Sequence, residues 1–319
     1  MKNGSIIKQR TLSKEFTLRG KGLHTGVDAT VTFRPAPCDH GYKIRRVDLK
    51  GSPIIKASAE NVINTQRSTV LSADGMQVAT IEHALAALYG CEIDNCLIEI
   101  NSFEFPILEG SSDIYVKNIY GVGVEEQAKE RIYYEVDHEI DYYDTETGSY
   151  LRLLPADKFS VDVQIEFNSG VLPVQNAFLD NLSDFKDEIS MCRTFVFIKE
   201  IESLLKTNLI KGGDLDNAIV IYDQQIQQRE LDRLADIMGI KRKKVDKTGY
   251  IMNKPLLYPN EPARHKLLDV IGDIALVGKF IKGKIIANRP GHQVNNLFAR
   301  NIIKQIRMKQ IFETSESFS

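Results

Sequence analysis

A histidine and an aspartate four residues apart suggest a metal site in the second half of the chain. His265 and Asp269 occur in the segment 264–273, and residues i and i+4 lie on one face of a helix. An imidazole and a carboxylate side by side are two of the three protein ligands of a catalytic zinc site, which leaves a fourth position for water. The third ligand must come from another part of the chain.

His83 is the candidate for that third ligand. It follows Glu82 directly, at the start of an apolar segment, 80–88, that predicts a helix. Adjacent helical residues point about 100° apart, so Glu82 does not easily share a metal with His83. A carboxylate beside a metal but not bound to it has the position of a general base. Spacing alone equally allows a carboxylate that balances the helix macrodipole, and a single histidine is more often an ordinary residue than a ligand.

Two segments of the chain align without gaps and predict a repeated architecture. Residues 82–90 and 264–272 each have His at the second position, Leu two residues later and Gly at the end, and an apolar strand follows each. This similarity predicts two α+β halves whose equivalent helices face each other, with one His from each. The polar, charged stretch 122–131 is the expected link. We therefore expect domains at 1–125 and 131–310, with the metal at their interface.

Two further residues could move or orient a proton. His292 ends the segment 288–292, a Pro-Gly loop after an apolar strand, which is a common place for a catalytic acid or base. Asp273 lies one turn beyond Asp269 on the same helix face and could orient an imidazole. The alternatives are an exposed turn histidine and an exposed helix carboxylate.

The segment 193–197 and the region after it are harder to interpret. Thr194 could donate its hydroxyl to a developing oxyanion, whereas spacing favours a plain strand with Phe195 in the core. The stretch 224–238 has apolar residues spaced as in an amphipathic surface helix, and these are Ile226, Leu231, Leu234 and Ile237.

Composition bounds the class of protein. The chain has 319 residues, 43% of them hydrophobic and 26% charged, as expected for a soluble globular protein of two domains. A net charge of -2 gives no electrostatic reason to expect a nucleic-acid partner. We see no secretory signal and no transmembrane segment. Four cysteines without C-x-x-C spacing predict reduced thiols and a cytoplasmic protein.

Taken together, the motifs resemble one family, the UDP-3-O-acyl-N-acetylglucosamine deacetylases, zinc amidases of lipid A (lipopolysaccharide) synthesis. Each motif is weak alone, but their order from residue 22 to residue 292 is specific. The matching segments are 22–26, 34–37, 80–83, 93–95, 106–111, 193–195, 212–213, 264–269 and 291–292. Glu109 stands where the family usually has Asp, and we interpret that segment as structural.

The resemblance implies a fold and an active site. The fold would be α+β, with two β-α-α-β sandwich domains whose helices pack between the sheets. His83, His265 and Asp269 would bind Zn²⁺, although Fe²⁺ also suits two imidazoles and a carboxylate. The remaining implied roles are Glu82 as general base, His292 as general acid, Asp273 as its orienting partner, Thr194 as oxyanion donor, and Lys266 near the sugar or the reaction centre.

The resemblance also implies how substrate binds. The substrate would be a UDP-sugar with a 3-hydroxyacyl chain, and hydrolysis of its N-acetyl group would give acetate and a free amine. An insert at about 195–222 would form a passage for the acyl chain. The residues implied to contact substrate are Phe195, Ile198, Ile201, Ile210, Gly213 and Ala218 around the acyl chain, and Phe167 and Arg289 at the uridine diphosphate.

One feature of this chain is typical of a branch of the family, and two other functions compete with the deacetylase assignment. Residues 218–222 and the longer stretch 224–260 resemble the branch in which the deacetylase is fused to a hydroxyacyl-ACP dehydratase. The resemblance therefore leaves two alternatives, a trimmed first part of such a fusion and a stand-alone enzyme. The rival functions are a different zinc hydrolase, such as a peptidase, and a catalytically silent metal- or lipid-binding module.

Overall fold

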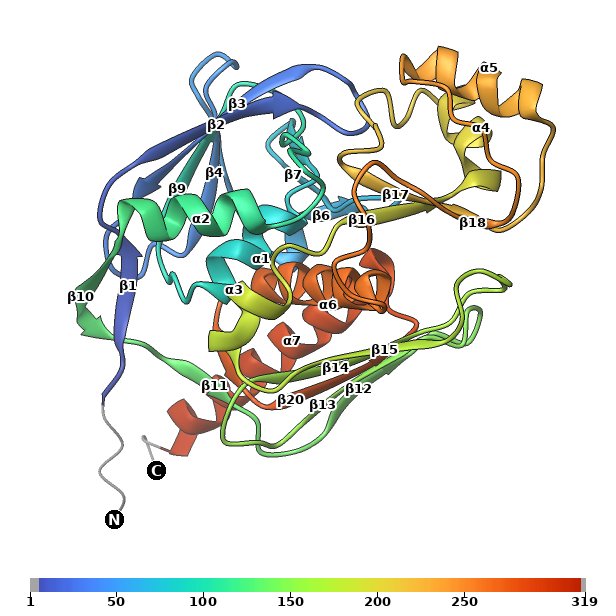
Figure 1. The fold of residues 1–319 in the computed structure, drawn as a ribbon. Coiled ribbons are helices and arrows are strands. Elements are labelled where there is room, and N and C mark those ends of the chain that lie inside the picture. The colour runs from blue at the N-terminus through green and yellow to red at the C-terminus, as the bar shows by residue number, and fades with distance from the viewer. Residues whose placement is uncertain (1–5, 317–319) are drawn as a thin grey trace.

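Two five-stranded sheets with the same topology form the outer layers of the protein in this computed structural model, which describes residues 6–316 (Figure 1). The strand orders are β2-β3-β9-β4-β5 and β12-β13-β20-β14-β15. In both sheets the third and fourth strands are parallel and all other neighbours are antiparallel. The bounds are β2 (Phe16–Lys21), β3 (Asp28–Pro35), β4 (Tyr42–Arg46), β5 (Ile54–Lys56), β9 (Cys96–Ile100), β12 (Ile140–Tyr143), β13 (Tyr150–Leu154), β14 (Ser160–Ile165), β15 (Gln175–Leu179) and β20 (Lys284–Asn288).

Four helices fill the space between the two sheets. They are α1 (Glu82–Gly90), α2 (Asp113–Val122), α6 (Glu261–Ile274) and α7 (His292–Glu316) (Figure 1). Counting only the five-stranded sheets and these four helices, the chain in each half runs through four strands, a helix, the central strand and a second helix. The expected fold class, two β-α-α-β sandwiches with helices between the sheets, is therefore confirmed.

The helices α1 and α6 pack closely at the centre, as the repeat predicted. Every residue of α1 is buried, which is typical of a helix that contacts protein on all sides. At Gly272 of α6, an added Cβ atom would lie only 2.2 Å from the carbonyl oxygen of Glu82. A side chain at this position would force the helices apart, so glycine permits the close approach that the site requires.

A smaller layer, formed by part of the second half of the chain, lies to one side of the two large sheets. It consists of a three-stranded sheet and two helices with their own apolar core. Its elements are β16 (Thr194–Phe197), α4 (Ile198–Lys206), β17 (Ala218–Tyr222), α5 (Gln228–Met238) and β18 (Gly249–Ile251) (Figure 1). The remaining elements are β1 (Lys8–Leu12), η1 (Ala59–Asn61), β6 (Val62–Asn64), β7 (Val70–Ala73), β8 (Met76–Ala79), β10 (Val124–Glu130), β11 (Tyr133–Glu135), η2 (Leu182–Asp184), α3 (Phe185–Glu188), η3 (Ala275–Val277) and β19 (Phe280–Lys282).

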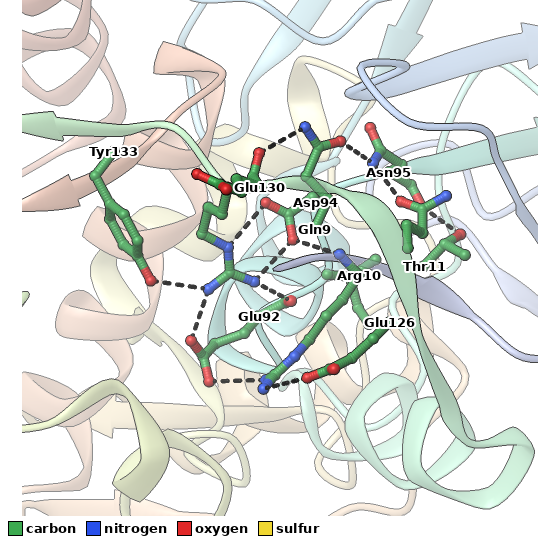
Figure 2. A network of polar contacts seen from close by, with 12 residues as sticks. Gln9, Arg10, Thr11, Glu92, Asp94, Asn95, Glu126, Glu130 and Tyr133 are labelled. Carbon is green, nitrogen blue, oxygen red and sulfur yellow. Dashed lines mark hydrogen bonds and ion pairs between the residues drawn. The ribbon is translucent and has the colours of Figure 1, made fainter. Parts of the chain in front are cut away.

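The stretch expected as a link forms a strand, and a buried arginine follows it. Strand β10 pairs with β1, and Arg131 comes directly after it. The Arg131 guanidinium donates to Asp94 at 2.8 and 2.9 Å and to Glu92 at 2.8 Å. Figure 2 shows Glu92 and Asp94 in a wider network of polar contacts. It also lies 4.0 Å from the ring centroid of Phe280 in β19. Because Glu92 and Asp94 follow α1, this arginine connects the two halves.

Two further findings concern membrane-spanning helices and cysteines. No helix in the described part of the chain combines the length and apolar character needed to cross a bilayer. All four cysteines are free thiols, and three of them are buried.

Candidate metal centre and active site

The three predicted ligands, His83, His265 and Asp269, lie together where α1 faces α6. One ligand atom from each residue falls within 4.8 Å of the others. Asp269 Oδ1 is 3.8 Å from His83 Nε2 and 3.5 Å from His265 Nε2. All three side chains are buried. The i,i+4 spacing places two of them on α6, and the packing of the helices brings the third from a position 182 residues earlier in the chain.

The atoms of this group fit a divalent metal ion. Asp269 Oδ1 is buried and has no hydrogen-bond partner, which is rare and costly for a carboxylate oxygen. Its other oxygen accepts a 2.8 Å bond from Lys266 Nζ. His265 Nδ1 lies 2.9 Å from the carbonyl oxygen of Cys192. That contact requires the proton on Nδ1 and leaves the Nε2 lone pair directed toward the group.

The histidines of the group are neutral. Burial, together with the neighbouring His265, lowers the pKa of His83 to about 3. Burial also lowers the pKa of His265. Burial alone would raise the pKa of Asp269, but Lys266 and the surrounding histidines hold it well below its usual range. Two neutral imidazoles and an ionised carboxylate are the protonation states that metal binding requires.

Glu82 stands beside the three-residue group. It begins α1, as the macrodipole alternative requires, but its carboxylate is buried. Its Oε2 accepts a 3.1 Å bond from the backbone N–H of Thr69, and its Oε1 lies 3.9 Å from His292 Nε2. Burial raises the pKa of Glu82 to about 7. A carboxylate of that basicity, held next to the ligands, can exchange a proton near neutral pH.

His292 is held by a chain of hydrogen bonds centred on Asp273. His292 Nδ1 is 2.9 Å from Asp273 Oδ2, and Thr69 Oγ1 donates to Asp273 Oδ1 at 2.6 Å. Asn295 Nδ2 also donates to Asp273 at 2.9 Å. Burial lowers the pKa of His292, but the carboxylates of Asp273, Asp269 and Glu82 together outweigh burial and raise this pKa to about 9. The alternatives of an exposed turn histidine and an exposed helix carboxylate do not describe these residues, because the Asp273 side chain is fully buried and that of His292 is only 10% exposed.

Thr194, Phe195 and Lys266 also lie near the centre. The Phe195 ring centroid is 6.5 Å from that of His265, and Lys266 Nζ is 5.5 Å from the Phe195 centroid. Thr194 begins β16, and its backbone N–H donates to the carbonyl of Gly110 at 2.8 Å. Both Thr194 and Phe195 line a pocket that opens beside the centre.

That pocket is mainly apolar and contains the residues expected to meet the acyl chain. Its predicted lining residues are Ile198, Ile201, Ile210, Gly213 and Ala218. Phe167 and Arg289, expected at the uridine diphosphate, are not part of its lining. Phe167 instead packs against Phe195 and Phe197, with ring centroids 5.7 and 5.2 Å away. Arg289 is exposed, and its backbone N–H donates to the carbonyl of Gln164.

Several residues of the site were not identified from sequence. Thr69 contacts both Glu82 and Asp273, and no spacing pattern marks it. His24 lies in a matching motif, 22–26, to which the resemblance attached no role. It lines the pocket, and both its ring nitrogens are buried without a hydrogen-bond partner. The helix α5 was expected only as a surface helix, yet its buried face lines the pocket through Leu231, Leu234, Ala235 and Met238. Ile237, expected on that apolar face, is 54% exposed.

Comparison with known proteins supports the same assignment. The family model described as LpxC, UDP-3-O-acyl N-acetylglycosamine deacetylase, matches residues 9–249 and 239–304, two segments that overlap just after α5. A protein of Bacteroides thetaiotaomicron named bifunctional enzyme LpxC/FabZ is 55% identical over 306 residues, which cover 96% of this chain and 66% of the relative. A protein of the same name from Porphyromonas gingivalis is 56% identical, with 95% and 66% covered.

A shorter relative matches nearly end to end. The UDP-3-O-acyl-N-acetylglucosamine deacetylase of Alcanivorax borkumensis is 35% identical over 304 residues, which cover 94% of this chain and 91% of the relative. The chain thus spans about two thirds of the bifunctional relatives and nine tenths of this one.

Proposed function

Because the chain belongs to the UDP-3-O-acyl-N-acetylglucosamine deacetylase family, we propose that it hydrolyses the N-acetyl amide of a UDP-sugar that carries a 3-O-(3-hydroxyacyl) chain. The products are acetate and the free amine, which is used in lipid A synthesis. The observation that carries the proposal is the buried group of His83, His265 and Asp269, with Glu82 on one side and the His292–Asp273 pair beside it.

His83, His265 and Asp269 would hold a zinc ion. When bound, zinc acidifies water and polarises a carbonyl oxygen. Two imidazoles and one carboxylate also suit iron(II), so metal availability decides between the two ions. Lys266, which donates to Asp269, fixes the orientation of this ligand.

The side chains around the centre move the protons. As the attacking water forms its bond to the amide carbon, the Glu82 carboxylate accepts a proton from that water. Thr194 donates its hydroxyl hydrogen bond to the oxygen on which negative charge develops. His292, protonated and held by Asp273, then gives its proton to the amide nitrogen as the carbon–nitrogen bond breaks.

The pocket beside the centre accepts the 3-hydroxyacyl chain. Most of its lining residues are apolar, Ile198, Ile201, Ile210 and Ala218 among them, and a mainly apolar lining favours a hydrocarbon chain. Phe195 lies where the pocket meets the metal group. The exposed Arg289 and Phe167 contact the uridine diphosphate from outside this pocket.

Two parts of the proposal concern the cellular setting. The UDP-sugar substrate places the reaction in the cytoplasm. In a longer form resembling the bifunctional relatives, a hydroxyacyl-ACP dehydratase domain is the additional part.

Release of acetate from the acylated UDP-sugar tests the function directly. We expect turnover with this substrate, loss of turnover with a chelator, and recovery with less than one equivalent of zinc. We expect no cleavage of peptides or of simple N-acetyl amides under the same conditions. Cleavage of a peptide instead would favour a different zinc hydrolase, and bound metal without any hydrolysis would favour a silent binding module.

A further inference from the structure

The helix α5 lies at the outer edge of the molecule, far from the α1–α6 pair that carries the metal group (Figure 1). It nevertheless lines the same pocket as Thr194 and Phe195. The pocket therefore extends from the reaction centre to this outlying helix. The family match consists of two segments that overlap at residues 239–249, immediately after α5.

The sequence of α5 shows which face meets the pocket. Leu231, Leu234, Ala235 and Met238 have the i, i+3, i+4, i+7 spacing of a single helical stripe, and all four line the pocket. The opposite face is polar, apart from the exposed Ile237. The entire apolar stripe of this helix is thus directed at the pocket.

Met238 and Gly213 lie close to each other across the pocket. A Cβ atom added at Gly213 would be 3.5 Å from Met238 Cε and 3.6 Å from Leu23 Cδ1. A flexible thioether side chain and the missing side chain of Gly213 therefore limit the width of the pocket at this point. Methionine is unbranched and adapts to irregular apolar surfaces, so Met238 can control the space without a rigid contact.

The helix is tied to the rest of the small layer by polar contacts outside the stripe. Arg233 of α5 forms a 3.1 Å ion pair with Glu202 of α4. Tyr222 at the end of β17 accepts a 3.0 Å bond from the backbone N–H of Ile226, just before α5. Since neither contact uses the apolar stripe, a change in the stripe can alter the pocket while these attachments remain.

We infer that α5 is the wall of the acyl pocket that sets the chain length this enzyme accepts, with Met238 as its main specificity-determining side chain. The inference rests on the proposed deacetylase function and adds the determinant of acyl-chain selection. Each methylene that finds room in an apolar pocket changes kcat/KM by roughly fourfold. Shortening Met238 should therefore move the preferred chain to a longer one.

The test compares Met238→Ala with Ile237→Ala, a matched control on the exposed face of the same helix. Acetate release is measured for parent and variants over UDP-sugars with 3-hydroxyacyl chains of increasing length, together with zinc content and melting temperature. We expect Met238→Ala to prefer chains about two carbons longer, with roughly a tenfold gain on the longer substrate, and Ile237→Ala to keep the parental profile.

Two outcomes would overturn the inference. One is an unchanged chain-length profile in a folded, zinc-loaded Met238→Ala protein. The other is an equal shift in Ile237→Ala, which would show that the helix as a whole, and not its stripe, is responsible. Met238→Val provides a smaller change of the same sign if the alanine variant is unstable. A parent enzyme that releases no acetate from any chain length would refute the proposed function itself, which is a different result.

Discussion

The candidate metal centre and the proposed acyl pocket lie side by side but are built differently. In the centre, individual polar atoms have assigned partners, such as Asp273 with His292, Thr69 and Asn295. In the pocket, many apolar side chains from α4, β17, α5 and the loops between them share the lining. Loss of one atom should therefore be severe in the centre, where hydrogen bonds to charged groups are involved, and graded in the pocket, where each methylene contributes a small amount.

The largest expected effect is removal of a metal ligand. His265→Ala and Asp269→Ala should each lose the bound metal and bring turnover to background, because three protein ligands are the minimum of such a site. Metal content after gel filtration and acetate release provide the two measurements. His138→Ala, which changes an exposed histidine, is the control and should keep both. Stoichiometric, tightly held zinc in Asp269→Ala would contradict the ligand set.

The proposed base should behave differently from the ligands. Glu82→Gln keeps the shape of the side chain and can keep a contact with the Thr69 backbone, but it cannot accept the proton. Zinc should remain bound, and kcat should fall by roughly 10²–10⁴-fold, the usual contribution of a positioned base. Loss of zinc in this variant would mean that Glu82 belongs among the ligands.

The proposed acid should control the alkaline limb of the pH profile. The pKa of His292 is raised to about 9, so activity that needs the imidazolium is present below that pH and is lost above it. Asp273→Asn removes the main charge that raises this pKa, and the limb should move to lower pH with a fall in kcat. A profile of kcat against pH, with zinc content as the control, measures the shift. An unmoved limb would assign it to another group.

The difference between the two regions also explains what the sequence could predict. The i,i+4 pair and the aligned segments 82–90 and 264–272 indicate a ligand set and facing helices, because helical spacing is local and readable. The sequence likewise predicted that apolar residues of the insert at about 195–222 line a single pocket. Thr69 was missed because its hydroxyl meets Asp273 across 204 positions of sequence, and a single threonine carries no periodicity. His292 was expected on a loop, whereas it begins α7, since nothing after it signalled the helix start.

A change at Thr69 should have an effect smaller than those at the metal ligands and larger than those in the pocket. Thr69→Val removes the 2.6 Å hydrogen bond to Asp273 but keeps the backbone N–H that donates to Glu82. Loss of a hydrogen bond to a charged group suggests a fall in kcat of roughly tenfold to a hundredfold, with zinc retained. The matched Thr69→Ser variant keeps the hydroxyl and should remain near the parental rate. Equal losses in the valine and serine variants would indicate a packing role for Thr69.

The smallest effect is expected in the pocket, at Gly213. A leucine there would meet Met238 and Leu23, both flexible side chains, and the Ile210 carbonyl oxygen, which lies 3.2 Å from the added Cβ. Gly213→Leu should therefore fold, keep zinc and prefer a shorter acyl chain, with kcat/KM for the parental chain reduced roughly 10–60-fold as two or three methylenes lose their room.

Combining the change with Met238→Ala should recover part of the longer-chain activity, because the two side chains occupy the same space and their effects should not add. If Gly213 belongs only to the apolar core, the leucine variant should show a lower melting temperature with the parental chain-length preference. Strictly additive effects in the double variant would show that Gly213 and Met238 do not share the pocket.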